Sequence, residues 1–247
     1  MISLKSVYHY CYTNGIILAF AGLHYSAQSY LLPYLIFRNF ALIYLIDYMT
    51  MGRIFHTSPH RIYELHTIQS ASLEYMALSL LPPLHDSSAI TVVTFIPMSF
   101  VFELLFDFFY FWAHFWFHLT RCPWHKDHHE SVNLMPLIAF HHHPLDEIFS
   151  KLIPFLLTQR IIHLVYPMSA LEIALLATYK VYIEIMGHIS CSSKRTCSFP
   201  QCIWLPRALG IELYADDHAL HHRQTGCNFA KRFTLWDRAF ETYRPHE

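Results

Sequence analysis

The sequence predicts an all-α integral membrane protein with about four transmembrane helices, arranged singly or as two hairpins, and a cytosolic helical cap. Hydrophobic residues make up 54% of the 247 residues and charged residues only 14%, whereas soluble domains contain about 25% charged residues. No Asp, Glu, Lys or Arg occurs between Ser6 and Phe37 or between Ser87 and Phe102. With only six glycines, the chain has few residues that disfavour helix.

Residues 1 to about 50 are expected to form apolar helix that turns near Leu32 and Pro33. A membrane-spanning helix needs about 20 mostly apolar residues, so the uncharged stretch from Ser6 to Phe37 is long enough for one span and a turn. The N-terminus lacks the basic start and small-residue cleavage site of a signal peptide, and the segment is therefore expected to be retained. A surface connector that contains Thr57, Ser58 and Pro59 follows.

Three further apolar blocks follow the connector, at residues 71–81, 88–118 and 149–177. The second block ends in an aromatic run, residues 106–117, that suits the interface between lipid and water. Pro154 and Pro167 interrupt the third block, which predicts two half-spans or a hairpin that dips into the membrane. Together with the N-terminal helix, these blocks give the predicted membrane segments.

The distribution of charge predicts the orientation of the chain. It has 17 basic and 18 acidic residues, and a net charge of −1 gives no overall field to attract nucleic acid. Basic residues concentrate in the last third, so the positive-inside rule predicts that this third faces the cytosol. The six cysteines follow no paired pattern, and a cytosol-facing placement would keep most of them reduced, so no disulfide is expected. A zinc site at Cys191, Cys197 and Cys202 is disfavoured because their spacing lacks a C-x-x-C pair.

Twenty histidines are present, and several of them fall into three closely spaced boxes. The boxes are His114/His118, His125/His128/His129 and His218/His221/His222. Residues four apart lie one above the other on a helix, so each box presents histidines on one face. Adjacent residues diverge by about 100° around the helix axis. A box with two adjacent histidines can therefore offer a ligand to each of two neighbouring metal ions.

Chance spacing is the alternative explanation for any single pair. His56 and His60 are also four residues apart, but Pro59 lies between them and no companion box adjoins them. Three boxes beside apolar helices favour a metal centre over pH-sensitive surface histidines. Imidazole suits zinc, copper, iron and nickel, and the lack of cysteine in the boxes argues against iron–sulfur and structural zinc sites. Zinc has no redox chemistry, so two iron ions that activate dioxygen are the preferred interpretation.

From Val101 to Arg244 the sequence resembles the fatty acid hydroxylase/sterol desaturase superfamily of membrane enzymes with a non-haem di-iron centre. The three boxes match its histidine motifs. Four further elements also match: His143-Pro-Leu-Asp146, Gly187-His188, Asn228-Phe229 and Trp236-Asp237. Phe115 replaces an arginine that often follows the first histidine in the family. The tail looks most like the branch of sterol-4-methyl oxidases and cholesterol 25-hydroxylase relatives.

This resemblance implies a membrane anchor at residues 1–100 and a di-iron catalytic domain at residues 101–247. It implies iron as the cofactor, dioxygen as co-substrate, and hydroxylation, oxidative demethylation or desaturation of a sterol or fatty-acyl lipid. The sequence shows no haem or flavin motif, so electrons are expected from a partner such as cytochrome b5 and an NAD(P)H reductase. The expected location is the endoplasmic reticulum membrane, with the histidine boxes facing the cytosol.

The expected metal ligands are the histidines of the three boxes and one that the resemblance adds: His114, His118, His125, His128, His129, His218, His221, His222 and His188. His143 precedes a proline and is expected either to touch a metal ion or to lie beside the ligands. Asp107 lies two helical turns before His114, where its carboxylate could fix an imidazole or serve helix packing instead. Asp146 and Asp217 are similar candidates for fixing an imidazole.

A histidine-rich membrane metal transporter or metal-binding protein is the alternative to an enzyme. A transporter is expected to carry histidines and carboxylates inside its apolar spans, because the ions must cross the lipid region. Here the boxes lie in amphipathic segments outside those spans, which favours the enzyme.

Overall fold

The computed structural model describes residues 4–50, 61–82, 89–129, 135–189 and 198–246. Within these ranges every regular element is helical, apart from isolated β-bridge residues, of which Glu212 and Phe233 pair with each other. The all-α class predicted from the sequence is confirmed. Outside the described residues lie the His56/His60 pair, the connector at residues 57–59, Cys191 and Cys197.

Long helices form the N-terminal half of the described chain: α1 (Leu4–Ser26), α2 (Leu31–Thr50), α3 (Arg61–Ser79) and α4 (Ala89–Leu119). The turn predicted near Leu32 lies slightly earlier, at the 3₁₀ turn η1 (Gln28–Tyr30). Pro33 falls in the first turn of α2, where the N–H that proline lacks has no helical partner in any case. Because α3 begins at Arg61, the predicted block 71–81 forms only its second half.

The second half contains shorter elements: α5 (Pro123–His129), η3 (Pro136–Phe140), α6 (Pro144–Glu147), the π-helical turn η4 (Ile148–Leu152), α7 (Ile153–His163), α8 (Ala170–Gly187), η5 (Pro200–Cys202), α9 (Trp204–Ala208), α10 (Ala215–Arg223) and α11 (Leu235–Ala239). The predicted block 149–177 is divided at both prolines. Pro154 lies in the first turn of α7, and Pro167 precedes α8. A capping box at Ser169 and Glu172 starts α8, since each side chain accepts a hydrogen bond from the other residue's N–H.

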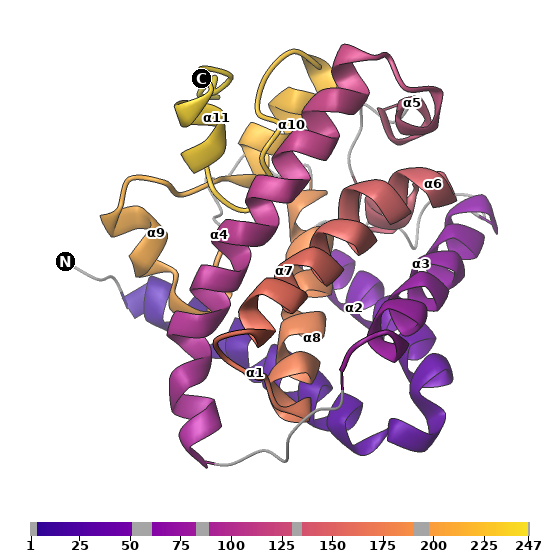
Figure 1. Ribbon diagram of the computed structural model, residues 1–247, viewed down its shortest axis with the longest axis vertical. Coiled ribbons are helices and arrows are strands. Elements are labelled where there is room, and N and C mark those ends of the chain that lie inside the picture. The colour runs from indigo at the N-terminus through magenta and orange to yellow at the C-terminus, as the bar shows by residue number, and fades with distance from the viewer. Residues whose placement is uncertain (1–3, 51–60, 83–88, 130–134, 190–197, 247) are drawn as a thin grey trace.

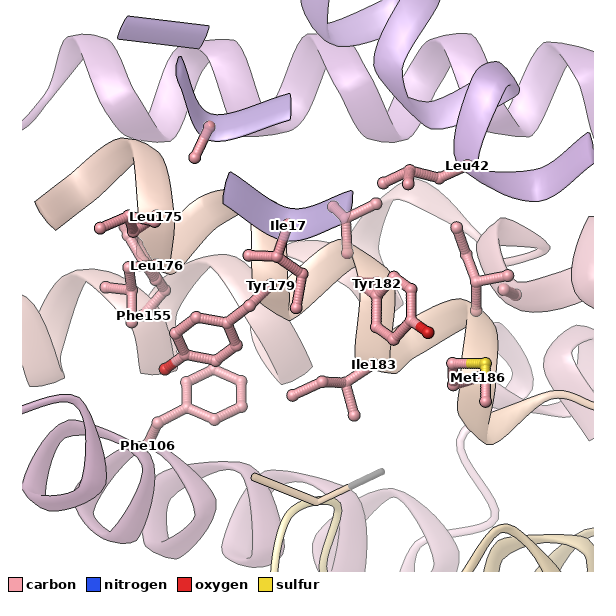
Figure 2. Close-up of a cluster of buried hydrophobic side chains, with 14 of the residues drawn as sticks. Ile17, Leu42, Phe106, Phe155, Leu175, Leu176, Tyr179, Tyr182, Ile183 and Met186 are labelled. Atoms are coloured by element: carbon pink, nitrogen blue, oxygen red, sulfur yellow. The ribbon is translucent and has the colours of Figure 1, made fainter. Parts of the chain in front are cut away.

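The central helix of the fold is α8, whose side chains are buried on almost every side. It packs against α1, α2 and α4. Figure 2 shows Tyr179, Tyr182 and Met186 of α8 in the largest apolar cluster, together with Ile17 of α1 and Leu42 of α2. A helix that is apolar around its whole circumference belongs in a core, and α8 therefore holds the other helices in position.

Among the described residues, two helices are long and apolar enough to cross a membrane, at Gln28–Thr50 and Val93–Leu119. The expectation that all boxes lie outside the apolar spans is wrong for the first box, because His114 and His118 lie in the last two turns of the second of these helices. α7 continues without a break from α6 and η4, so these three elements form one helical stretch from Pro144 to His163. Large apolar side chains are exposed, among them Val93, Leu164 and Val165. Four spans, a cytosolic cap and a division near residue 100 stay predictions.

Candidate metal centre

All nine histidines expected as metal ligands gather at one end of the molecule. Figure 1 shows α4 running to this end, where α5 and α10 lie beside it. The first group is His114, His118, His125, His129 and His221, and the second group is His128, His188, His218 and His222. Within each group the candidate ligand atoms lie within 4.8 Å of one another. The structure thus brings together every box predicted from the sequence.

In the first group the Nε2 atoms of the imidazoles converge. Their distances are 3.1 Å from His114 to His118, 3.1 Å from His118 to His125, 3.0 Å from His125 to His129 and 3.2 Å from His129 to His221. Two imidazoles that bind one ion at about 2.0–2.1 Å and at right angles place their nitrogens about 3 Å apart. The observed spacing therefore fits ligands of a shared ion.

The second group is wholly buried. His218 Nε2 lies 3.2 Å from His222 Nε2 and 3.4 Å from His188 Nε2. The ring of His128 completes the group, with its centroid 4.6 Å from that of His222. These four imidazoles also fit one ion.

Adjacent histidines of one box belong to different groups. The ring planes are inclined at 77° for His128 and His129 and at 87° for His221 and His222. This divergence follows from the step of about 100° per residue in a helix. Helices α5 and α10 therefore supply both groups, which lie side by side, with the ring centroids of His129 and His222 only 4.7 Å apart.

Backbone carbonyls hold four of the imidazoles on the side away from the metal position. The Nδ1–H groups donate from His114 to Phe229 O at 2.7 Å, from His221 to Cys227 O at 2.6 Å, from His128 to His141 O at 3.3 Å and from His188 to Glu184 O at 2.8 Å. A proton on Nδ1 leaves the lone pair on Nε2. These hydrogen bonds therefore assign the tautomer that binds a metal through Nε2 and also fix the ring orientation.

Asp146 holds a fifth imidazole in the same way. Its Oδ2 accepts hydrogen bonds from His125 Nδ1 at 3.1 Å and from His142 Nδ1 at 3.0 Å. Burial opposes ionisation of this carboxyl, but the two imidazole hydrogen bonds hold the pKa of Asp146 below its usual value. His142 in turn stacks on His128, with the ring centroids 4.0 Å apart. Asp146 thus occupies the position expected of a carboxylate that orients a ligand.

The buried histidines are neutral at physiological pH. Burial lowers the pKa of His128, His218 and His221 well below the usual value for histidine, and the neighbouring histidines add to the effect. Burial also lowers the pKa of His188, to about 4. Metal ions and protons compete for the same nitrogen, so a neutral imidazole is the form that binds metal.

Asp107 and Asp237 fix the backbone segment that supports the first group. Asp107 accepts hydrogen bonds from the N–H groups of residues 231–233, at 2.7, 2.9 and 3.0 Å. Asp237 accepts from the N–H groups of Phe229 and Ala230, at 2.7 and 2.9 Å. Asp107 therefore fixes a backbone segment against α4, which is the packing role expected as its second possibility, and it does not orient an imidazole.

Asp217 and His143 lie outside both histidine groups. Asp217 caps α10 by accepting from the Tyr214 N–H at 2.9 Å, and it also bonds His246 Nδ1 at 2.8 Å. His143 caps α6, where its Nδ1 accepts from the Leu145 N–H at 3.2 Å. Both side chains stabilise helix ends near the centre, and neither reaches a candidate ligand.

Sequence reasoning missed an ion-pair network beside the second group. Lys151 Nζ lies 2.9 Å from His142 Nε2 and 3.1 Å from a carboxylate oxygen of Glu184. Lys231 Nζ lies 2.6 Å from the same carboxylate. The one available signal was the position of Glu184, four residues before His188 on a helix.

The two groups differ in their access to the surroundings. The first borders a cavity of about 570 Å³, lined by His118, His125 and His129 together with Arg121 and Lys126. The cavity that borders the second group measures about 20 Å³. An ion, a small molecule or an electron donor can therefore approach the first group more directly.

The comparison with known families rests on the region that contains these nine histidines. A family model described as fatty acid hydroxylase matches residues 99–242, more than half of the chain. The chain belongs to the fatty acid hydroxylase family. The resemblance expected from the histidine boxes and the elements after them is thereby confirmed.

Two curated relatives extend the comparison. Fatty acid hydroxylase vlmA of Lecanicillium sp is 32% identical over 153 residues, which cover 58% of this chain and 40% of the relative. Delta(7)-sterol 5(6)-desaturase ERG3A of Gibberella zeae is 28% identical over 149 residues, which cover 60% of this chain and 38% of the relative. The match thus spans about two fifths of each relative. No solved structure matches the chain significantly.

Proposed function

We propose that the chain is a membrane-bound di-iron oxygenase that uses dioxygen to hydroxylate, oxidatively demethylate or desaturate a sterol or fatty-acyl lipid. The observation that carries this proposal is the division of nine convergent histidines into two adjacent groups. One mononuclear site cannot use so many imidazoles. The family match supports a lipid as the substrate, as do the two relatives, a fatty acid hydroxylase and a sterol desaturase.

The residues of the centre fit iron. Imidazole nitrogens suit ferrous iron, and each group offers enough of them to hold one ion. When bound, the two ions supply the redox chemistry that activates dioxygen against an unactivated C–H bond. The chain holds ligand rings through backbone carbonyls and Asp146, and it buries all four histidines of the second group.

Electrons for this chemistry are proposed to come from a separate protein, such as cytochrome b5 with an NAD(P)H reductase. Arg121 and Lys126 line the cavity beside the first group. Both are exposed cations, which suit an acidic partner protein. We further propose the endoplasmic reticulum membrane as the location, with this cavity facing the cytosol. The two long apolar helices and the exposed apolar side chains support a membrane.

Metal analysis of the purified full chain tests the proposal. Under reducing, iron-replete conditions we expect about two iron ions per chain, one for each histidine group. Alanine at His128 or His221 should lower the iron content and abolish lipid oxidation while the protein stays in the membrane fraction. The matched control is His143→Asn, which keeps a helix cap at a histidine outside both groups. A purified chain that contains zinc or copper and no iron would favour the alternative function, a membrane metal transporter or metal-binding protein.

The substrate is identified by comparing lipids of cells with and without the protein. A lipid that accumulates without the chain, paired with an oxidised product that disappears, is the expected result. Unchanged sterols and fatty-acyl lipids would contradict the proposed reaction.

A further inference from the structure

A second cavity lies on the other side of the second histidine group, between α3, α7 and α8. Its volume is about 120 Å³, against about 570 Å³ for the cavity beside the first group, and it is partly open to the surroundings. Much of the lining is apolar, and it includes Leu73, Ala77, Leu78, Phe155 and Val181. Phe106 and Phe155, which Figure 2 labels, carry this lining into the apolar core.

One part of this cavity is polar and adjoins the metal centre. Glu147 lines it and directly follows Asp146, whose carboxylate holds His125. Glu184 also lines it, and the backbone carbonyl of Glu184 holds the imidazole of His188. The lining of this cavity therefore includes one residue that holds a ligand histidine and one that adjoins such a residue in the chain.

The cations that line the cavity already have carboxylate partners. Glu103 lies 2.9 Å from Lys180 Nζ and 2.9 Å from Arg232 Nε. Glu184 pairs with the two others, Lys151 at 3.1 Å and Lys231 at 2.6 Å. An anionic ligand would have to compete with these carboxylates for each cation.

Glu147, by contrast, has an unused hydrogen-bonding atom. Its side chain is 5% exposed, and Oε1 accepts a hydrogen bond from Ser70 Oγ. Oε2 is buried and has no hydrogen-bond partner among the residues that the structure describes. Such groups are rare in folded proteins because a lost hydrogen bond to water is not replaced. The π-helical turn η4 begins directly after Glu147, and turns of this kind occur often at functional sites.

We propose that this cavity binds a lipid alcohol whose hydroxyl group hydrogen-bonds to Glu147. A hydroxyl group both donates and accepts, so it can pair with this carboxyl whether or not the carboxyl is ionised. A fatty acid carboxylate can only accept, so it cannot donate a hydrogen bond to the unpaired Oε2 of Glu147. A lipid without a hydroxyl group leaves the buried oxygen unpaired. This inference rests on the proposed function, since it names the class of substrate for the adjacent centre.

Equilibrium binding to the iron-loaded full chain in detergent tests the inference. The probes are radiolabelled octadecanol, its methyl ether and octadecanoate, and in a separate arm cholesterol and its methyl ether. We expect an alcohol in at least one arm to bind about tenfold or more tightly than its ether, and octadecanoate to bind weakly. The arm with the larger ratio distinguishes a linear alcohol from a sterol. Octadecanoate as the tightest ligand, or equal binding of alcohol and ether in both arms, overturns the inference.

Variants of Glu147 assign the contact. Glu147→Met removes the carboxyl at similar volume and should reduce binding of the alcohol to the level of its ether, while binding of the ether stays unchanged. Glu147→Gln keeps a polar partner and should retain most of the preference. Undiminished preference in Glu147→Met refutes the contact. If that variant does not fold, the wild-type comparison of alcohol, ether and carboxylate still decides.

The iron content of the same samples separates this inference from the proposed function. If the chain prefers the alcohol but holds no iron, the binding site for a lipid alcohol is supported and the oxygenase proposal is refuted. If the chain holds two irons but shows no preference for the alcohol, the oxygenase proposal is supported and the lipid-alcohol inference is refuted.

Discussion

Replacement of Asp146 by Asn should weaken metal binding at one histidine group. Oδ2 of Asp146 is the atom that holds His125, a member of the first group, at 3.1 Å. Asparagine preserves the shape and an acceptor oxygen but removes the negative charge that polarises the imidazole. Carboxylates that orient ligand histidines contribute about 10–100-fold to metal affinity, which corresponds to about 1.4–2.7 kcal/mol at 25 °C.

The assay is anaerobic titration of the metal-free protein with ferrous iron against a competing chelator, which gives a dissociation constant for each group. In Asp146→Asn the constant of the first group should rise by about 10–100-fold, and that of the second should change by a smaller factor. Glu147→Gln is the matched control, because Glu147 is the adjacent carboxyl residue and is also buried but bonds Ser70 instead of a histidine. Equal weakening of both groups, or the same loss in the control, would refute the reasoning.

Three further measurements test other parts of the structure. Asp107→Asn disrupts at least one of three hydrogen bonds to residues 231–233. Each hydrogen bond to a charged group contributes about 1.5–3 kcal/mol to the free energy of unfolding, so the thermal unfolding midpoint should fall. An unchanged midpoint would contradict the packing role of Asp107. A chelator should remove one of two bound ions first, since the first group borders the larger cavity, whereas release of both at one rate would argue against unequal access. Burial lowers the pKa of His142 to about 3 and of His188 to about 4. The unfolded chain takes up these protons below about pH 6.5, so the free energy of unfolding of the metal-free protein should decrease on acidification from there, by up to about 1.4 kcal/mol per pH unit for each histidine. Denaturant titrations at pH 7, 6 and 5 measure this slope, and constant stability would oppose it.

The histidine boxes could be predicted from the sequence because local helix geometry determines how neighbouring side chains relate. His114 and His118 needed only one turn of α4 to converge, and His128 and His129 needed only adjacency to diverge. The grouping across boxes was not predictable in the same way. It depends on the packing of α10 against α4 and α5, from which α10 is widely separated in the chain.

Asp107 shows where sequence reasoning about the site ended. Its place two turns before His114 was correct for an orienting carboxylate, but residues 231–233 occupy that side of α4 and offer three N–H donors. The carbonyls of Cys227 and Phe229 gave no signal at all, because every residue carries a carbonyl and only the fold aims it. In the fold itself, the apolar block expected at residues 71–81 showed only the second half of α3, because the first half, from Arg61, also carries polar residues such as Glu64.

The segment at residues 227–233 has a consequence for how the protein is made. It supplies the carbonyls behind His114 and His221, and Asp237 must be present to hold it. In the order of synthesis these residues follow every histidine of the centre. The imidazoles can approach one another earlier, but the rings of His114 and His221 are not held in place until this segment leaves the ribosome. A metal ion delivered during translation would meet two loose ligands of the first group, so loading of that group belongs after synthesis of this segment.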